Sequence, residues 1–197
     1  PENNKIFVIP NGVDTEYFRL QAMPKEYDLL FSGNMAYAPN IISAEYLAKR
    51  ILPLVIQKYP RARLMIAGAN PVNSIKSLKS KNIEVSGWVD DMRVVYAKSK
   101  IFIAPMQIGC GLQNKLLEAM AMQLPCITSG LANSALGATD KTEILVGETP
   151  EEYAGLIIQL LENKQLYSTI SQNGNFYVKK NYQWDAAMAK LDKIICT

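Results

Sequence analysis

Short apolar segments alternate with segments of helical periodicity along most of this chain, and this alternation is the feature that most constrains its fold. The predicted strands are residues 5–9, 28–32, 63–67, 83–86, 101–105 and 126–129, with a short last strand at 143–146. Most of these runs lack polar alternation and several end at a glycine. Strands of this kind form parallel sheets with helices on both faces. We therefore predict a doubly wound α/β fold, in which ligands bind beyond the carboxyl ends of the strands.

The segments between and after these strands have the periodicity or the caps of helices. Helices are predicted at 40–58, 74–80, 115–122, 150–162, 164–180 and 184–195, and one capped by Asp90 and Asp91 is predicted to run through Ser99. Asn40 is the predicted N-cap of the first helix, and Pro53 should kink or break it. The small residues at 130–140 predict a loop. The last three helices predict a helical C-terminal tail.

Composition narrows the function classes. The chain has 197 residues, enough for a sizeable core, and its apolar runs Ile51–Ile56 and Ile101–Met106 are far shorter than the ~18–20 residues of a membrane span. A net charge of +3 without a basic run argues against a nucleic-acid partner. Histidine is absent, which excludes Ser-His-Asp and Cys-His catalysis and His-ligated metals. Three cysteines without metal-ligand spacing indicate a reducing compartment and no metal site.

The segment 109–114, Gly-Cys-Gly-Leu-Gln-Asn, follows a predicted strand and opens a predicted helix. Glycines let a ligand approach the backbone, and the free N–H groups of a helix start suit a phosphate or pyrophosphate. As a dinucleotide fingerprint the segment is incomplete, because Asn114 stands where the third glycine belongs and no acid follows the next strand. A dehydrogenase is therefore disfavoured. A plain turn between strand and helix remains the alternative.

Glu118 lies one turn into that helix, among apolar neighbours on nearly all sides. One interpretation is a solvated carboxylate paired with Lys115, three residues before it. The other is a carboxylate in a cleft that a hydroxylated ligand enters, because a buried carboxylate needs a partner. Its position just after the turn at 109–114, which suits a phosphate, favours the second interpretation.

Three stretches, taken in order, resemble the C-terminal, donor-binding half of a GT-B glycosyltransferase of group 1 (family four). They are Val-Ile-Pro-Asn-Gly-Val-Asp at 8–14 with Phe18, Gly-Trp-Val-Asp-Asp at 87–91, and Gly-Leu-Gln-Asn-Lys-Leu-Leu-Glu-Ala-Met-Ala-Met at 111–122 with Pro125. Tyr-Gln-Trp at 182–184 resembles the end of these enzymes. Gly33–Asn40 is similar to a motif of bacterial sugar transferases of polysaccharide pathways. The resemblance implies a Rossmann-like donor domain.

The resemblance also implies roles for individual residues. Glu118 matches the last acid of the Glu-x7-Glu motif, which binds the ribose hydroxyls of the nucleotide. The pyrophosphate and the sugar would be bound by the amides of Gly111, Leu112, Gln113 and Asn114, and the base by the backbone around Gly87, Trp88 and Val89. Gly33 and Asn34 would face the phosphates from the other side. Asn11 and Gly12 would lie beside the interdomain cleft. Lys115 is a candidate phosphate ligand. No residue is assigned as catalytic.

The chain departs from the family pattern at three positions. Cys110 replaces the first glutamate of Glu-x7-Glu, Asn34 stands where many members have arginine, and Pro39 stands about where a phosphate-binding lysine comes. The charge of the leaving group must then be met by the helix N-terminus, by Lys115 and by the other half of the enzyme. Cys110 itself is interpreted as a small space-filling residue beside the site rather than as a nucleophile.

We therefore predict that residues 1–197 form the donor domain of a retaining, hexosyltransferase-type enzyme whose N-terminal acceptor domain is absent from this chain. The donor is a nucleotide-diphosphate sugar, bound without a cofactor or metal, and the acceptor is a sugar or lipid-linked glycan. The alternatives are a non-catalytic nucleotide-binding module and a nucleotide-sugar epimerase of GT-B fold, which the lack of histidine disfavours. The isolated domain is expected to be inactive. The expected location is the cytoplasm, with peripheral contact at the inner membrane face.

Overall fold

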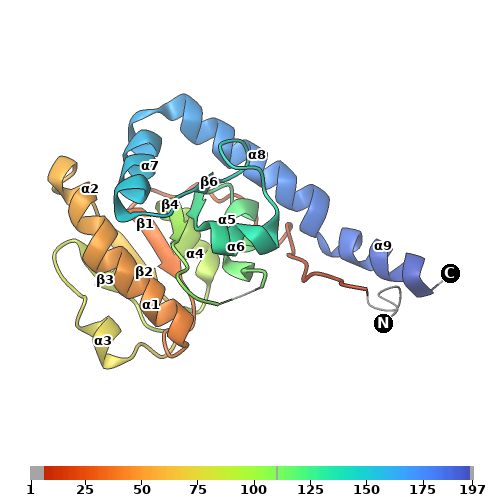
Figure 1. The fold of residues 1–197 in the computed structure, drawn as a ribbon, viewed down its shortest axis with the longest axis horizontal. Helices are drawn as coiled ribbons and strands as arrows, with labels where there is room; N and C mark the ends of the chain where they lie inside the picture. Colours follow the sequence, from red (N-terminus) through yellow and green to blue (C-terminus); the bar gives the residue numbers. More distant parts are fainter. Residues whose placement is uncertain (1–6, 110, 196–197) are drawn as a thin grey trace.

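A computed structural model describes residues 7–109 and 111–195 of the chain. These residues contain a six-stranded sheet in the order β3-β2-β1-β4-β5-β6, and every neighbouring pair is parallel. The strands are β1 (Tyr27–Ser32), β2 (Leu64–Ala67), β3 (Ile83–Val85), β4 (Ser99–Ala104), β5 (Cys126–Thr128) and β6 (Leu145–Val146). This order confirms the predicted doubly wound, Rossmann-like fold (Figure 1).

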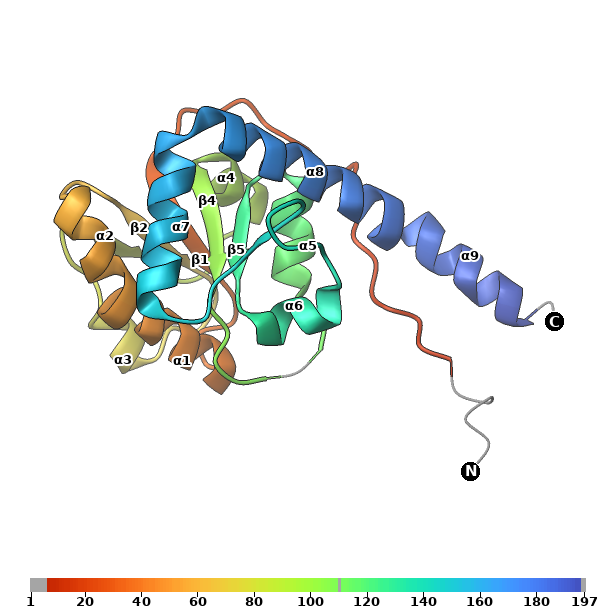
Figure 2. The same ribbon diagram turned by 45° about the horizontal axis from the view of Figure 1, so that its top comes forward.

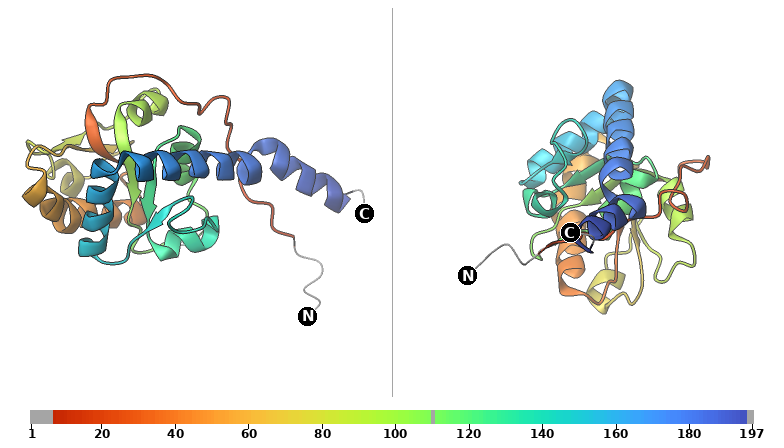
Figure 3. Two further views of the ribbon diagram at one scale, coloured as in Figure 1. Left: turned by 90° about the horizontal axis from the view of Figure 1, so that it is seen from above. Right: turned by 90° about the vertical axis from the view of Figure 1, so that its right-hand side faces the viewer.

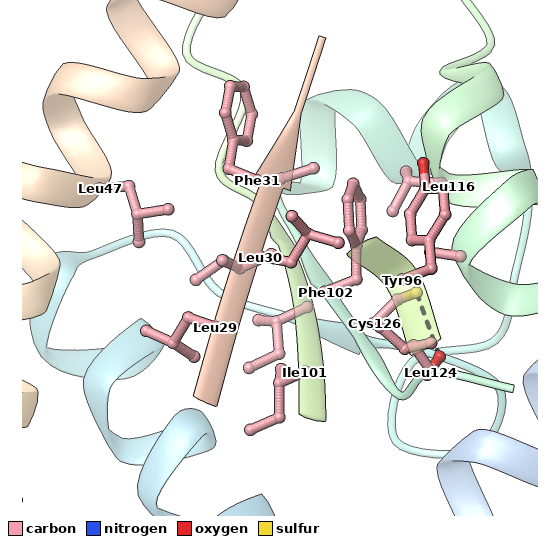
Figure 4. Packing of buried hydrophobic residues seen from close by; sticks show 14 of the residues in the cluster. Leu29, Leu30, Phe31, Leu47, Tyr96, Ile101, Phe102, Leu116, Leu124 and Cys126 are labelled. Atoms are coloured by element: carbon pink, nitrogen blue, oxygen red, sulfur yellow. Dashed lines mark hydrogen bonds between the residues drawn. The ribbon is translucent and has the colours of Figure 1, made fainter. Parts of the chain in front are cut away.

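Helices cover both faces of the sheet. In chain order they are α1 (Ala38–Tyr46), the π-helical turn η2 (Leu47–Ile51), α2 (Leu52–Lys58), α3 (Asn73–Lys76), α4 (Met92–Ala97), α5 (Asn114–Ala121), α6 (Gly130–Leu136), α7 (Pro150–Glu162), α8 (Lys164–Tyr182) and α9 (Trp184–Ile195). Figure 4 shows Leu47 on one side of β1, and Tyr96 and Leu116 on the other. Tyr46 and Tyr153 meet edge to face, so α1 and α7 pack on the same side.

The central strands are buried along almost their whole length. Leu29, Leu30 and Phe31 of β1 have no exposed surface, and neither do Ile101 and Phe102 of β4. Leu30 pairs with Phe102 across the parallel ladder, which continues the apolar layer from one strand to the next. Apolar burial of this extent is the main favourable contribution to folding, at ~25 cal/mol per Å². The core therefore lies on both faces of β1 and β4.

Pro53 does not end the first helix. The π-helical turn η2 immediately precedes it, and α2 continues to Lys58. Proline lacks an N–H and its ring clashes with the carbonyl four residues earlier. A wider turn removes this clash, and such turns occur as single insertions within α-helices. The helix is thus disturbed near Pro53, as predicted, but the disturbance is a local change of helix type and not a break.

Three sequence predictions are wrong. Residues 130–140 contain α6, which Ser129 caps with its side chain and which Gly137 ends in the left-handed conformation. Asn40 is not an N-cap, because α1 begins at Ala38 and Asn40 is buried within its first turn. Within the described part of the predicted first strand, residues 7–9 form no strand, and Val8 is 84% exposed. Among the described residues, no strand of the sheet pairs with this apolar run.

The predicted helical tail is confirmed, and it meets the start of the chain. Thr149 and Glu152 form a capping box at α7, and α8 then crosses the sheet domain (Figure 2). The Val13 amide donates a hydrogen bond of 2.7 Å to the Tyr182 carbonyl, which fixes the N-terminal segment beside the α8–α9 junction. The N-terminal segment from residue 7 and helix α9 extend from the same side of the sheet domain (Figure 3). None of the helices in the described residues is long and apolar enough to cross a bilayer.

Candidate functional site

A cavity of about 650 Å³ opens at the carboxyl edge of the sheet, where the strand order reverses between β1 and β4. Its walls come from the ends of β1, β2 and β3 and from the start of α5. The lining residues are Ser32, Gly33, Asn34, Asn40, Gly68, Ala69, Asn70, Trp88, Val89, Met92, Leu112, Asn114, Lys115 and Glu118. This is the position at which doubly wound folds bind ligands.

The loops after β1 and β2 approach each other so closely at this edge that glycine is required. A Cβ atom on Gly68 would lie 1.8 Å from the carbonyl oxygen of Gly33, and Gly68 has a φ of +140°. A side chain at Gly68 is therefore excluded both by space and by backbone conformation. The close approach brings Gly33, Gly68 and Asn70 to one wall of the cavity.

The N-terminus of α5 forms the opposite wall. The N-cap residue is Gln113, and its side chain makes no capping hydrogen bond. In contrast, Asp91 caps α4 and Thr149 caps α7. The first amides of an uncapped helix are free donors with partial positive charge. Since Asn114 and Lys115 both line the cavity, these donors border the space where a ligand fits.

Glu118 lies one turn further along α5, half-buried in the cavity wall. Its Oε2 accepts a hydrogen bond of 2.8 Å from the Tyr96 hydroxyl. Burial raises the pKa of the Glu118 carboxyl, and the Tyr96 hydrogen bond and the charge of Lys115 partly oppose that rise. Glu118 and Lys115 form no ion pair within 4.0 Å in the described residues. The interpretation of Glu118 as a solvated partner of Lys115 is therefore wrong.

Lys115 turns into the cavity wall instead of into solvent. Its ammonium lies 4.7 Å from the centre of the Phe31 ring and donates a hydrogen bond to Oδ1 of Asn40. Burial lowers the pKa of Lys115 to about 8, although the Glu118 carboxylate favours the charged form. An anion beside this ammonium would gain a charge-assisted hydrogen bond.

Asn34 and Asn40 shape the loop that leaves β1. The Oδ1 of Asn34 accepts the Ala36 amide at 3.0 Å, and Nδ2 of Asn40 donates to the Asn34 carbonyl at 3.0 Å. Asn34 lines the cavity, and its role opposite the phosphates stays a prediction. Pro39 is buried and does not line the cavity. The lysine that the resemblance expects near Pro39 therefore has no counterpart there.

Trp88 and Val89 line the cavity beyond the end of β3, and their role at the base stays a prediction. Trp88 is 74% exposed, and its Nε1 donates a hydrogen bond of 3.0 Å to Oδ1 of Asp90. A large aromatic side chain with this much exposed surface is suited to stack on a planar group. Gly87 does not line the cavity; its carbonyl accepts the Gly68 amide at 3.1 Å and so holds the second and third loops together.

A second, smaller cavity of about 170 Å³ lies between α5 and the N-terminal segment. Gly12, Asp14, Asn114, Glu118 and Trp184 are among its lining residues, so Glu118 borders both cavities. Nδ2 of Asn11 donates to Oδ1 of Asn114 at 3.4 Å. A Cβ atom on Gly12 would lie 2.7 Å from the Trp184 ring, so this glycine permits the ring to pack on the backbone.

The sequence profile of the family described as "Glycosyl transferases group 1" matches residues 26–163, more than half of the chain. The chain belongs to the group 1 glycosyl transferases. It is 24% identical over 165 residues to a 44.6 kDa protein in the cps region of Klebsiella pneumoniae, covering 79% of this chain and 42% of that relative. The chain spans 30–42% of the lengths of the three curated relatives it matches.

Solved structures of GT-B glycosyltransferases share the fold. The C-terminal domain of the group 1 glycosyl transferase LpcC from Francisella tularensis has a TM-score of 0.71 at 21% identity, covering 87% of this chain and 99% of that one. Anabaena HepE, in complex with UDP and glucose, has a TM-score of 0.79 at 12% identity, covering 97% of this chain and 56% of that one. The resemblance to the C-terminal half of a GT-B enzyme is therefore confirmed for family and fold.

The predicted site residues of this chain do not all meet at one cavity. The main cavity brings together Glu118, Leu112, Asn114, Lys115, Gly33, Asn34, Trp88 and Val89. Gly111 and Gln113 lie beside it, where Nε2 of Gln113 donates to the Gly111 carbonyl at 3.2 Å. Asn11 and Gly12 belong to the smaller cavity side, as described above. Cys110 lies outside the described residues.

Several lining residues escaped the sequence analysis. Ser32 and Met92 reach the cavity only because strand ends converge there, whereas Gly68, Ala69 and Asn70 directly follow a predicted strand, where ligands were expected to bind. Asn40 was expected at a helix cap and instead holds the Lys115 ammonium. Tyr96, which binds Glu118 from behind the cavity wall, lies within the apolar run Val94–Ala97, and that pattern indicates burial but no polar role.

Proposed function

We propose that this chain is the donor half of a retaining, hexosyltransferase-type glycosyltransferase. The 650 Å³ cavity binds a nucleotide-diphosphate sugar, and transfer goes to a glycan or lipid-linked acceptor bound mainly by a domain outside this chain. The coverage of 30–42% of the relatives' lengths supports a second domain. The reaction takes place in the cytoplasm, at the inner membrane face when the acceptor is lipid-linked.

One observation carries the proposal: Glu118 and the uncapped start of α5 lie one turn apart on the wall of the same cavity. A carboxylate accepts hydrogen bonds from vicinal hydroxyls, and free helix amides donate to phosphate oxygens. A nucleoside diphosphate presents both kinds of group within a few bond lengths. The arrangement therefore matches the ribose and the pyrophosphate of one ligand.

Positive charge for the leaving diphosphate comes from α5 and Lys115. Bond cleavage at the anomeric carbon leaves negative charge on the diphosphate, and donors fixed near that charge lower the barrier. Among the residues that line the main cavity, Lys115 is the one lysine or arginine. A bound diphosphate favours the protonated ammonium and raises the pKa of Lys115 above its value of about 8 in the free chain.

UDP is the first nucleotide to test. The solved structures of Anabaena HepE and of Staphylococcus aureus TarM, both similar in fold, are complexes with UDP. The exposed face of Trp88 supplies a surface on which a pyrimidine ring stacks.

The proposal is tested by titrating the 197-residue chain with UDP, GDP and ADP in a calorimeter, with Glu118→Gln as the comparison. Saturable binding of a nucleoside diphosphate that weakens in Glu118→Gln supports it. No binding of any of the three overturns it. Donor turnover by this chain alone would contradict the assignment of the acceptor site to another domain. Binding without sugar transfer by the full-length protein would favour a non-catalytic nucleotide-binding module.

A further inference from the structure

Tyr96 is a fully buried tyrosine whose hydroxyl reaches the back of the nucleotide cavity. Its ring packs against Phe18 and Phe102, with ring centres 6.4 and 5.8 Å away. Figure 4 shows that the hydroxyl points in the direction in which β1 runs from Leu29 to Phe31, toward the carboxyl edge of the sheet. The aromatic contacts hold the ring in one place, so the hydroxyl has a fixed position.

The hydroxyl belongs to a chain of hydrogen bonds that ends on Glu118. It lies 2.8 Å from Oε2 of Glu118 and 3.2 Å from Oγ of Ser32, which is itself buried. An ionised carboxylate only accepts hydrogen bonds, so Tyr96 donates its single proton to Glu118. Ser32 must then donate its own proton to the Tyr96 oxygen. The charge of Glu118 therefore fixes the direction in which both hydrogen bonds are donated.

We propose that Tyr96 is a positioning residue that holds Oε2 of Glu118, with Ser32 behind it, so that the carboxylate faces the ribose hydroxyls. This inference rests on the proposed function. With Oε2 held from inside the wall, the other oxygen of Glu118 is left to accept from the ligand. The Tyr96 hydrogen bond also favours the ionised carboxylate, because a donor to the charged form lowers the pKa of the acid and so opposes the rise that burial causes.

The other titratable groups around Glu118 are few. Lys115 lies on the same helix, Asp14 of the N-terminal segment lines the smaller cavity beside Glu118, and Cys126 of β5 lies behind Tyr96. Burial raises the pKa values of Tyr96 and Cys126, so both side chains stay neutral at physiological pH. The carboxylate of Glu118 is thus the group at this wall whose charge Tyr96 influences.

The test compares wild type and Tyr96→Phe by the ratio of affinities for UDP and 2′,3′-dideoxy-UDP, measured from pH 5 to 7.5. The ratio isolates the ribose contact, because titration of the phosphates affects both ligands. In wild type, the affinity for UDP relative to that for the dideoxy analogue falls on acidification as Glu118 becomes protonated. Loss of a hydrogen bond to a charged group should move the midpoint of that fall upward by about one pH unit. At the pH of the wild-type midpoint, the ratio should be about threefold to tenfold lower in Tyr96→Phe than in wild type.

Tyr167→Phe is the matched control. Its hydroxyl also makes a 2.8 Å hydrogen bond, to the carbonyl of Lys100, and it does not line the main cavity. This variant should keep the wild-type ratio and midpoint. Ser32→Ala, which removes only the second donor, should move the midpoint in the same direction by less and serves if Tyr96→Phe does not fold.

The outcomes separate the inference from the proposed function. A raised midpoint in Tyr96→Phe or Ser32→Ala, with Tyr167→Phe unchanged, supports the positioning role. If Tyr96→Phe and Ser32→Ala both keep the wild-type midpoint while Glu118→Gln no longer prefers UDP over the dideoxy analogue, the role of Tyr96 is overturned. The proposed nucleotide site is then unaffected. A wild-type chain that binds UDP and the dideoxy analogue equally at every pH overturns the ribose contact itself.

Discussion

The Lys115 ammonium on α5 donates a hydrogen bond to the side-chain oxygen of Asn40 on α1, 75 residues earlier in the chain. Asn40 in turn donates from its amide nitrogen to the carbonyl of Asn34, in the loop that leaves β1. The cation of one cavity wall and the loop of the other are therefore joined through one side chain.

Lys115→Met should weaken UDP binding by about tenfold to a hundredfold, the value of a charge-assisted hydrogen bond of ~1.5–3 kcal/mol. The thioether side chain keeps the packing over Phe31 and removes the charge. Uridine, which has no phosphate, should bind both proteins equally. Lys49→Met, at an exposed lysine paired with Glu45, is the matched control and should leave UDP binding unchanged. Equal loss of uridine and UDP affinity in Lys115→Met would show a structural effect instead.

Binding of UDP should depend on pH because of the lowered pKa of Lys115. Below pH 8 the ammonium is already protonated in the free chain, so affinity should be steady with respect to this group. Above pH 8 the free chain loses the proton that the complex retains, and affinity should fall by up to about tenfold per pH unit. Titrations in the wild type between pH 7 and 9 should show this slope. In Lys115→Met, a slope of the same size would assign the effect to another group.

The fluorescence of Trp88 should report the base. The chain has two tryptophans, and Trp88 is 74% exposed at the cavity, whereas Trp184 packs on Gly12 away from it. UDP should quench or shift the emission, because stacking changes the surroundings of the exposed ring. Trp88→Phe should abolish the signal and Trp184→Phe should keep it. The opposite pattern would remove Trp88 from the base site.

Gly68→Ala should destabilise the fold by at least ~2 kcal/mol, because its Cβ would clash with the Gly33 carbonyl at a backbone conformation that favours glycine. The paired control is Gly155→Ala, in α7, where a Cβ meets nothing within 4 Å. Removing a glycine from a helix interior should stabilise the chain by ~0.5–1 kcal/mol. Urea unfolding of the three proteins measures both changes. Equal stability of Gly68→Ala and wild type would mean that the two loops can separate.

The sheet could be predicted from the sequence because its strands are buried on both faces. All four residues of β2 are buried, and such a strand must be a continuous apolar run that ends where the chain leaves the core. Local signals also sufficed where the contact itself is local. Asp91 accepts the Arg93 amide at 2.9 Å as a cap, and Pro150 begins α7 as predicted.

The errors arise where distant contacts outweigh a local preference, or where local signals are weak. Asn40 has the residue type of a cap, but its contacts with Lys115 and Asn34 place it inside α1. The small residues of α6 read as a loop, although Ser129 and Gly137 are ordinary signals for the start and the end of a helix. The bond between Tyr96 and Glu118 spans 22 residues and has no periodic signature. Pairs of this kind follow from the topology of the sheet.

Glu118→Gln should weaken UDP binding by about tenfold to a hundredfold with little change in fold stability. The amide keeps nearly the same volume, but it loses the charge that strengthens hydrogen bonds from the two ribose hydroxyls, each interaction of this type being worth ~1.5–3 kcal/mol. Calorimetric titration gives the two affinities, and thermal unfolding of the free proteins gives the two stabilities.

The 2′,3′-dideoxy analogue turns this comparison into a double-mutant cycle. When the hydroxyls are absent, the substitution at Glu118 should cost less than about threefold, because the contact is already lost. Asp14→Asn is a matched carboxylate-to-amide control, since Asp14 borders only the smaller cavity, where Glu118 is its neighbour. It should weaken UDP and the dideoxy analogue to the same small extent. If Glu118→Gln also weakens both ligands equally, Glu118 does not contact the ribose, and its carboxylate serves the helix wall rather than the ligand.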